Sequence, residues 1–267
     1  MRKIKLPKGA INVALFIATI ISTCFISPLY SAAIITILLA HELGHFFMCK
    51  KHGVESTLPY FIPFPFSPFG TFGAVIRMKG RMPNKQALFD IGVAGPLAGL
   101  FFAIPAIIIG LSLSTTHPVE EVTAGKGFMH LGEPLLFSFI SKIIFGNISD
   151  NVDIVLHPIA YAGWTGLFVT ALNLLPVGQL DGGHVMYALL GRKSEFIYKI
   201  GILLFCVFTV LWYHGWILMT ILLLLFGFQH PAPVDETTGL DSRRKLLGII
   251  MFIVFVLSFT PEPISFK

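Results

Sequence analysis

Three ionisable residues stand inside an apolar run that is long enough to cross a lipid bilayer. His41, Glu42 and His45 lie in the segment 32–48, where nearly all the other residues are apolar. Ionisable side chains are rare among lipid tails, because burying them there is unfavourable, and those that occur usually serve a function. Residues four apart share one face of a helix, so both imidazoles can reach one metal ion. The segment therefore predicts a metal-binding helix inside a membrane.

The composition supports a membrane location. Apolar residues make up 55% of the 267-residue chain and charged residues 12%, whereas soluble domains carry about 25% charged residues. A net charge of +5 would suggest a nucleic-acid partner in a soluble protein, but here the charges flank apolar runs, and we expect no nucleic-acid partner. The three cysteines lie in or beside apolar segments without a CxxC pair, so we expect no disulfide.

Apolar runs of membrane-spanning length recur along the chain. They predict an all-α polytopic membrane protein with about six to seven transmembrane helices. The fifth and sixth runs are contiguous apart from a break at 212–215, which predicts a tight helical hairpin. The sixth run is short. Whether the seventh run crosses the membrane is left open. The first run follows four basic residues, as a signal peptide would, but no clear cleavage site follows it, so we expect a retained helix. The runs are Ala10–Leu29, Ser31–Met48, Ala87–Leu113, Leu156–Leu175, Phe196–Tyr213, Gly215–Phe228 and Leu246–Phe259.

The distribution of lysine and arginine predicts the orientation. With a cytoplasmic N-terminus and alternating spans, nearly every basic residue of the connections falls in the cytoplasm, where membrane proteins carry an excess of them. Only three lysines fall on the outer side, together with several acidic residues. We therefore expect a multi-pass protein of the plasma (cell inner) membrane. The outer lysines are Lys126, Lys142 and Lys267.

Two connections carry patterns of their own. The segment 56–69 interleaves four prolines with five aromatic residues, so it cannot be helical and is too apolar for a solvated loop. The following residues 70–80 are typical of a short strand bounded by glycines. Together they predict a re-entrant β-hairpin or loop on the cytoplasmic side, whose strand Thr71–Ile76 either accepts an extended substrate or only closes the cytoplasmic mouth. In the long outer connection, Leu135–Phe145 predicts an interfacial helix.

The HExxH spacing of His41, Glu42 and His45 is the zinc motif of metallopeptidases, in which the glutamate activates a water molecule. A catalytic zinc needs a third ligand, and Asp181 is the candidate. Pro176 ends the preceding helix, and we expect Gly182-Gly183 to let the backbone turn, so that an irregular stretch presents Asp181. The alternatives are that both histidines are hydrogen-bonded core residues and that Asp181 belongs to an ordinary turn.

The two motifs together, HELGH and NLLPVGQLDGG, resemble the site-2 protease family of intramembrane zinc metalloproteases, in its branch without PDZ or CBS domains. The resemblance covers about residues 30–190, and the glycine-rich 92–99 and His157-Pro158 are also similar to the family. It implies that His41, His45 and Asp181 bind one catalytic Zn²⁺ and that Glu42 is the base. Asn173 would donate a hydrogen bond to the reacting carbonyl of the substrate. Alternatively, its side chain would cap backbone carbonyls that lose their helical hydrogen bonds at Pro176. The chain would be one membrane-embedded domain, 1–267, with a catalytic core at 30–190 and C-terminal helices at 196–260.

The function that the resemblance implies is hydrolysis of peptide bonds in or near the transmembrane segments of membrane proteins within the lipid bilayer. Such substrates must unwind locally, and an upstream protease or regulatory partner often acts before the cut. The alternatives are a membrane zinc transporter or a pseudo-protease that binds substrates without cutting them.

Gly92, Gly95 and Gly99 are assigned to helix packing. His184 either supports or replaces Asp181, or is a polar residue near the cytoplasmic surface, and five further histidines receive no role: His52, His117, His130, His214 and His230.

Overall fold

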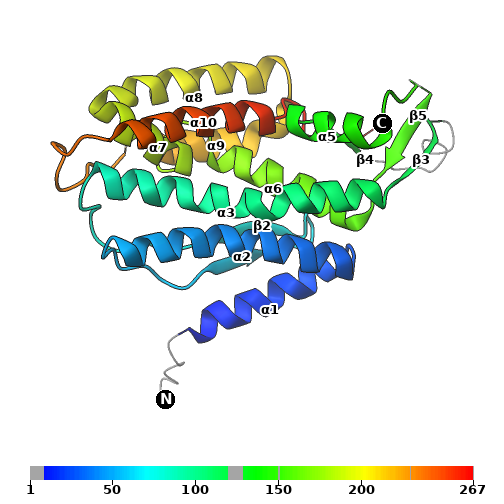
Figure 1. Cartoon of the computed structure of the whole chain (residues 1–267), viewed down its shortest axis with the longest axis horizontal. Helices are drawn as coiled ribbons and strands as arrows, with labels where there is room; N and C mark the ends of the chain where they lie inside the picture. Colours follow the sequence, from blue (N-terminus) through cyan, green and yellow to red (C-terminus); the bar gives the residue numbers. More distant parts are fainter. Residues whose placement is uncertain (1–8, 120–128, 150, 229, 267) are drawn as a thin grey trace.

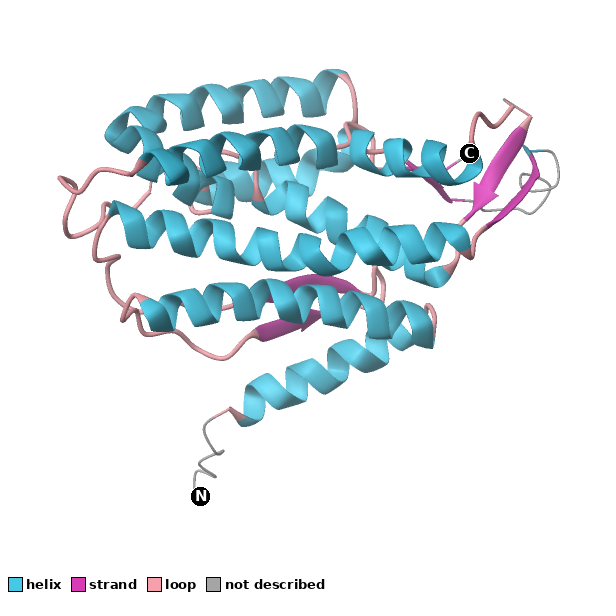
Figure 2. Ribbon diagram, viewed as in Figure 1, coloured by secondary structure: helices cyan, strands magenta, loops and turns pink. Residues whose placement is uncertain are grey.

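Helices form most of the structure, and short strands connect some of them (Figures 1 and 2). The computed structural model describes residues 9–119, 129–149, 151–228 and 230–266. Their helices are α1 Ala10–Cys24, α2 Pro28–Lys51, α3 Lys85–Ser112, α5 Leu135–Phe145, α6 Pro158–Asn173, α7 Asp181–Leu190, α8 Ser194–Leu211, α9 Ile217–Phe226 and α10 Ser242–Ser258. Their strands are β1 Tyr60–Pro63, β2 Thr71–Val75, β3 Thr115–Pro118, β4 Met129–Leu131, β5 Val152–Val155 and β6 Ile264–Phe266.

Three helical stretches of the described residues are long and apolar enough to cross a membrane: Pro28–Lys51, Lys85–Ser112 and Asp181–Leu211. The last of these joins α7 and α8 through a short 3₁₀ turn. The other predicted spans are also helical in large part, but each is shorter than 18 residues. The predicted class of helical membrane protein is therefore confirmed in its coarse form, whereas the number of spans stays a prediction.

The first predicted span is shorter than its apolar run. The helix α1 ends at Cys24, and α2 begins at Pro28, so the run Ala10–Leu29 contains a break. Proline favours the first position of a helix, and the side chain of Ser27 accepts a hydrogen bond from the backbone N–H of Leu29 as a cap. Local capping signals inside the run thus start a new helix before the apolar residues end.

The centre of the molecule is built on α3, which packs against α2 on one side and α6 on the other (Figure 1). The contacts are close because glycines stand where the helices meet. A Cβ on Gly44 would lie 2.4 Å from the carbonyl oxygen of Ala94, and one on Gly110 would lie 2.1 Å from the backbone nitrogen of Ala160. Backbone therefore packs directly on backbone, as small residues allow in membrane helices.

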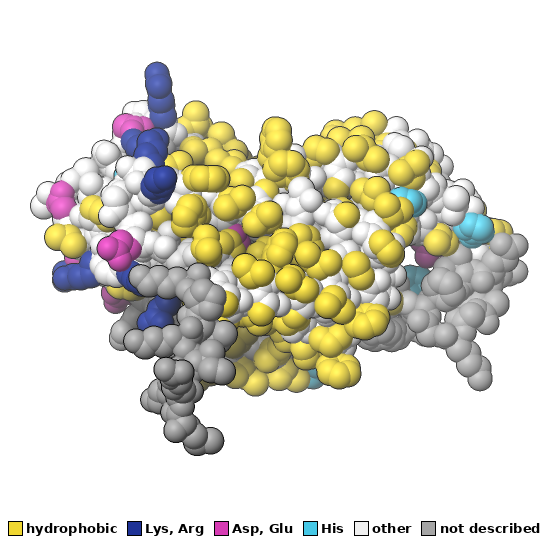
Figure 3. All heavy atoms as spheres, turned by 90° about the horizontal axis from the view of Figure 1, so that it is seen from below, with side chains coloured by type: hydrophobic (Ala, Val, Ile, Leu, Met, Phe, Trp, Pro, Cys, Tyr) yellow, Lys and Arg dark blue, Asp and Glu magenta, His cyan; other side chains and the backbone are white. Residues whose placement is uncertain are grey.

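Apolar side chains cover much of the outer surface. Figure 3 shows hydrophobic side chains over most of one face, with Lys and Arg gathered at one end. Large apolar residues that are more than half exposed occur on several helices, among them Ile17 on α1, Phe101 on α3 and Leu203 on α8. Water would disfavour such a surface, whereas lipid tails would not. The surface is thus that of an integral membrane protein.

The strands β1 and β2 pair antiparallel, with Tyr60 opposite Val75. The connection between them is anchored at the N-terminal ends of α2 and α6. The hydroxyl of Tyr30 donates to the carbonyl of Phe69 at 2.9 Å, and the hydroxyl of Tyr161 donates to that of Pro68 at 2.9 Å. The proline-rich segment is therefore non-helical, as predicted, and is held against protein; its position relative to a membrane stays a prediction.

The outer connection contains the helix α5 with the bounds that the sequence predicts. It also contains strands that the sequence does not predict: β3 pairs with β5, and β4 pairs with β6 at the end of the chain. The β4–β6 pair joins residues more than 130 positions apart in sequence. Short strands of three or four residues leave little local pattern, so only the fold reveals these pairings.

Candidate metal centre

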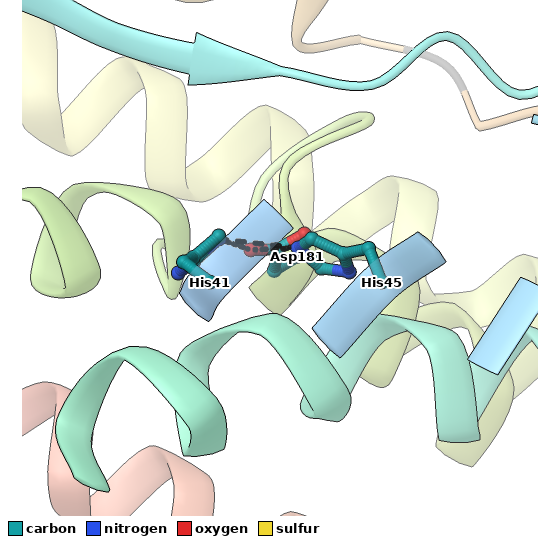
Figure 4. Close-up of side chains that lie close together, drawn as sticks. All are labelled: His41, His45 and Asp181. Carbon is teal, nitrogen blue, oxygen red and sulfur yellow. Dashed lines mark hydrogen bonds and ion pairs between the residues drawn. The ribbon is translucent and has the colours of Figure 1, made fainter. Parts of the chain in front are cut away.

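His41, His45 and Asp181 converge at one point between α2 and the start of α7 (Figure 4). Each histidine offers its Nε2 atom, and these atoms lie 3.2 Å and 3.3 Å from Oδ2 of Asp181. The two Nε2 atoms are 3.1 Å apart. Both histidines are buried. The three predicted ligands therefore form a nearly equilateral triangle of donor atoms.

This triangle fits a tetrahedral metal ion. Ligand bonds of about 2.0–2.1 Å in a tetrahedron place the donor atoms roughly 3.3 Å apart, close to the distances found here. Oδ2 of Asp181 is buried and has no hydrogen-bond partner among the described residues. A buried carboxylate oxygen needs a compensating partner, and a cation at the centre of the triangle would supply it. Three protein ligands would leave a fourth position open, as catalytic sites require.

The orientation of His45 is fixed by α3. Its Nδ1 lies 2.8 Å from the carbonyl oxygen of Ile91, to which it donates a hydrogen bond. This bond selects the tautomer that leaves Nε2 free for a metal ion. The sequence contains no sign of this contact, because any backbone carbonyl can accept the bond.

Two glycines of α3 make room for the histidine rings. A Cβ on Gly95 would lie 2.0 Å from Nε2 of His45, and a Cβ on Gly99 would lie 3.2 Å from Nδ1 of His41. The predicted role of these glycines in bringing α3 close to α2 is therefore confirmed, as it is for Gly44, and the side chains next to Gly95 and Gly99 are the two candidate ligands. Gly92 lies against His184 of α7 instead.

Glu42 is buried beside the triangle and follows His41 on α2. The helix α2 also contacts the strand β2. Glu42 interacts electrostatically with His45 and Asp181. A buried carboxylate next to a metal centre and a strand has the position that a general base needs.

Asn173 is the last residue of α6 and reaches the same point. Its Nδ2 lies 3.3 Å from Nε2 of His41. The side chain therefore borders the centre, and its role beside the reacting carbonyl stays a prediction. A hydrogen-bonding amide at this place could donate to an oxygen that becomes negative during the reaction.

The way in which Asp181 is presented differs from the prediction. The turn lies at residues 174–180, with Gly178 at a φ of +56°, and Asp181 begins the regular helix α7. Gly182 and Gly183 do not turn the chain; they lie in the first turn of α7. A Cβ on them would stand 2.1 Å and 2.2 Å from the carbonyl oxygens of Leu174 and Gly178. The turning role predicted for Gly182 and Gly183 is therefore wrong, because these glycines allow a close approach instead. The predicted irregular stretch lies at 174–180 and ends at the N-terminus of α7, which carries the carboxylate and favours negative charge.

Two further histidines, His184 and His230, lie next to this centre. His184, three residues after Asp181, is buried, with 7% of its surface exposed. Its predicted position near the cytoplasmic surface stays a prediction. Its Nδ1 lies 2.5 Å from Nε2 of His230, and the His230 ring stacks on Tyr187 with centroids 4.6 Å apart. His230 received no role from the sequence, and its distance of 46 residues from His184 leaves no local signal.

The fold and the site define an integral membrane protein with a buried centre of two imidazoles and one carboxylate. The model of the family "Peptidase family M50" matches residues 29–211, which include all three candidate ligands. The chain therefore belongs to this peptidase family, and the predicted resemblance to site-2 proteases is confirmed.

Several known proteins are similar to this chain. "Probable zinc metalloprotease EGY1, chloroplastic" of Arabidopsis thaliana is 36% identical over 162 residues, which are 60% of this chain and 29% of the relative. "Probable zinc metalloprotease EGY2, chloroplastic" of the same plant is 29% identical over 246 residues, 88% of this chain and 42% of the relative. The chain thus spans less than half the length of these relatives. The solved structure "Site-2 Protease from Methanocaldococcus jannaschii" matches 93% of this chain and 86% of that chain, with 19% identity and a TM-score of 0.38.

Proposed function

We propose that this chain is an intramembrane zinc metalloprotease that hydrolyses peptide bonds in or near the transmembrane segments of membrane proteins. The observation that carries the proposal is the triangle of His41, His45 and Asp181, in which the buried Oδ2 of Asp181 has no hydrogen-bond partner among the described residues. The triangle lies on helices of membrane-spanning length, and a buried glutamate stands beside it. Family membership supports the same activity.

One zinc ion is the proposed cofactor. Two imidazole nitrogens and one carboxylate oxygen are donors that zinc accepts, and the distances between them suit its tetrahedral preference. The similar plant proteins are named as probable zinc metalloproteases. When bound, zinc would supply Lewis-acid activation of water and of the scissile carbonyl at neutral pH.

The protein groups account for the proton transfers. Glu42 accepts a proton from the attacking water, whose oxygen forms a bond to the carbonyl carbon of the substrate. The C–N bond then breaks, and Glu42 returns the proton to the departing amine, so the reaction consumes one water and needs no covalent intermediate. The amide of Asn173 donates a hydrogen bond to the carbonyl oxygen as negative charge develops on it.

We propose that an extended substrate segment reaches the centre along β2. The strand β2 contacts α2, the helix that carries Glu42, and strand addition would bring a scissile peptide bond close to this base. Phe72 and Val75 of β2 are more than half exposed and offer side-chain contacts. A substrate helix has to unwind before it can bind in this way, so local helix breakers near the cut favour cleavage. A strand that only closes the mouth of the site is the alternative.

The remaining features follow the predicted topology. The chain would form one membrane-embedded domain over residues 1–267, with a catalytic core at 30–190 and C-terminal helices at 196–260. We propose six to seven spans, a cytoplasmic N-terminus and a re-entrant β1–β2 pair; the gathering of Lys and Arg at one end of the molecule supports this orientation (Figure 3). The plasma membrane is the proposed location, although the similar plant proteins are named as chloroplastic. An upstream protease or regulatory partner is proposed from the resemblance.

A cleavage assay in proteoliposomes tests the function. The purified chain is mixed with a single-span test protein whose transmembrane segment contains Gly, Pro or Asn, and zinc content is measured in parallel. We expect the natural chain to cleave, and Glu42→Gln to lose cleavage while it keeps bound zinc. The matched control is Glu55→Gln, which changes an exposed glutamate beyond the end of α2. Normal cleavage by Glu42→Gln would refute the base, and zinc uptake by liposomes without cleavage would favour a transporter.

A further inference from the structure

A segment that follows the family-matched residues 29–211 is fastened across one end of the molecule. We call residues 230–241, between α9 and α10, the strap. The backbone N–H of Val234 donates to the carbonyl of Met82 at 2.8 Å, and that of Asp235 donates to the carbonyl of Pro83 at 2.9 Å. The side chain of Gln86 donates to the carbonyl of Gly239 at 3.0 Å. The strap is therefore attached to the chain just before and at the start of α3.

The strap leads into α10, whose Arg244 forms a bidentate ion pair with Asp90 of α3. Its Nε lies 2.7 Å from Oδ1 of Asp90, and its Nη2 lies 2.8 Å from Oδ2. His52, at the end of α2, contacts the same Oδ2 at 2.9 Å. The Asp90 side chain is 12% exposed. Paired hydrogen bonds to a carboxylate fix both partners in distance and direction, so this junction sets how α2, α3 and α10 stand relative to one another.

The ion pair is one residue from a contact of the metal centre. Asp90 precedes Ile91, whose carbonyl oxygen accepts the Nδ1–H of His45. Adjacent residues of a helix move together, because the i→i−4 hydrogen bonds keep the backbone rigid. Whatever fixes Asp90 therefore also fixes the carbonyl that orients the metal-binding ring of His45.

The start of the strap contacts the helix that carries the third ligand. His230 bonds to His184 on α7, and both side chains are buried. His184 lies three residues after Asp181, so it shares the first turns of α7 with the carboxylate. The strap thus reaches α7 through His230, and the start of α10 that follows it reaches α3 through Arg244.

We propose that residues 230–244 are a positioning element for the metal ligands. Arg244 holds His45 in place through Asp90 and the Ile91 carbonyl, and His230 holds Asp181 in place through His184. These residues touch neither the substrate nor the metal ion; they act through the groups that orient the ligands. The inference rests on the proposed zinc function and adds to it a contribution from residues beyond the matched family region.

Zinc affinity tests the inference. The purified protein in lipid nanodiscs competes with a chromogenic chelator for zinc, and the thermal midpoint of the metal-free protein is recorded for each variant. Groups that orient metal ligands typically contribute 10- to 100-fold in affinity, so we expect Arg244→Gln and His230→Ala each to weaken zinc binding about 10-fold. The matched control is Arg243→Gln, which removes an exposed neighbouring charge and should leave the affinity unchanged. Because Arg244 acts through Asp90, the double variant Asp90→Asn/Arg244→Gln should bind zinc no more weakly than the worse single variant.

The outcomes separate the inference from the function on which it rests. A natural chain that binds no zinc would overturn both. Normal zinc binding by Arg244→Gln, at an unchanged midpoint of the metal-free protein, would overturn the inference alone. If Arg244→Gln does not fold, Arg244→Lys decides, because lysine keeps the charge but cannot form the paired bonds. We expect this variant to bind zinc more weakly than the natural chain, and an unchanged affinity would again refute the positioning role.

Discussion

The substitution Gly95→Ala adds only one methyl group, yet it should strongly weaken zinc binding. The new Cβ would lie 2.0 Å from Nε2 of His45 and 2.5 Å from the two ring carbons beside it. Ordinary contact begins at 3.4 Å, so the nitrogen would have to move by 3.4 − 2.0 = 1.4 Å. Metal–ligand bonds tolerate deviations of about 0.2 Å. The ring therefore cannot keep its place as a ligand.

The expected magnitude follows from what is lost. Removing a group that only orients a ligand weakens metal binding about 10- to 100-fold, and Gly95→Ala displaces the ligand itself. We expect zinc affinity to fall by at least about 100-fold, which corresponds to roughly 2.8 kcal/mol. The assay is chelator competition on the purified protein, with cleavage of the test substrate measured at saturating zinc.

A second glycine of α3 supplies the matched control for Gly95→Ala. A Cβ on Gly99 would lie 3.2 Å from the nearest atom of His41, so a shift of a few tenths of an ångström relieves the contact. Gly99→Ala should therefore cost less than about 10-fold in zinc affinity. Normal zinc binding by a folded Gly95→Ala variant would refute the placement of His45 as a ligand.

Two further predictions concern stability. Zinc at a concentration of 100 times its dissociation constant should raise the free energy of unfolding of the natural chain by about 2.7 kcal/mol, measured by chemical unfolding. Asp181→Asn removes one ligand, so zinc should not stabilise this variant. An equal gain in the variant would contradict the site. Burial and the neighbouring His184 lower the pKa of His230 to about 3. Below about pH 6.5 the unfolded chain therefore binds a proton that the folded chain excludes, so stability falls as the pH decreases toward 3. His230→Gln should reduce the fall in thermal midpoint between pH 7 and pH 5. The control variant His214→Gln, which changes an exposed histidine, should not reduce it. Identical pH profiles for His230→Gln and the natural chain would contradict the burial of His230.

Local patterns made the helix of the HExxH motif and the candidate ligands predictable. The four-residue spacing of His41 and His45 places both rings on one helix face whatever the rest of the chain does. Asp181 required more, because an Asp-Gly pair is common in turns, and only the conjunction of two motifs singled it out. The helix α5 was predictable because Leu135–Phe145 is an apolar run within the long polar connection.

Contacts between distant residues were not predictable. Arg244 and Asp90 are 154 residues apart, and His184 and His230 are 46 apart; nothing in their immediate surroundings marks either pair. The sequence predicts that Gly95 brings α3 close to α2, but it does not reveal which atoms of α2 Gly95 faces. Small residues at this spacing are common wherever membrane helices pack, so the sequence cannot tell whether a glycine faces a backbone or a metal-binding ring.

Zinc-edge X-ray absorption on the purified protein tests the central claim most directly. We predict one zinc ion per chain, bound by two imidazole nitrogens and by oxygen at about 2.0–2.2 Å, and loss of this signal in Asp181→Asn. A protein without zinc, a sulfur ligand in the spectrum, or an unchanged spectrum in Asp181→Asn would contradict the account.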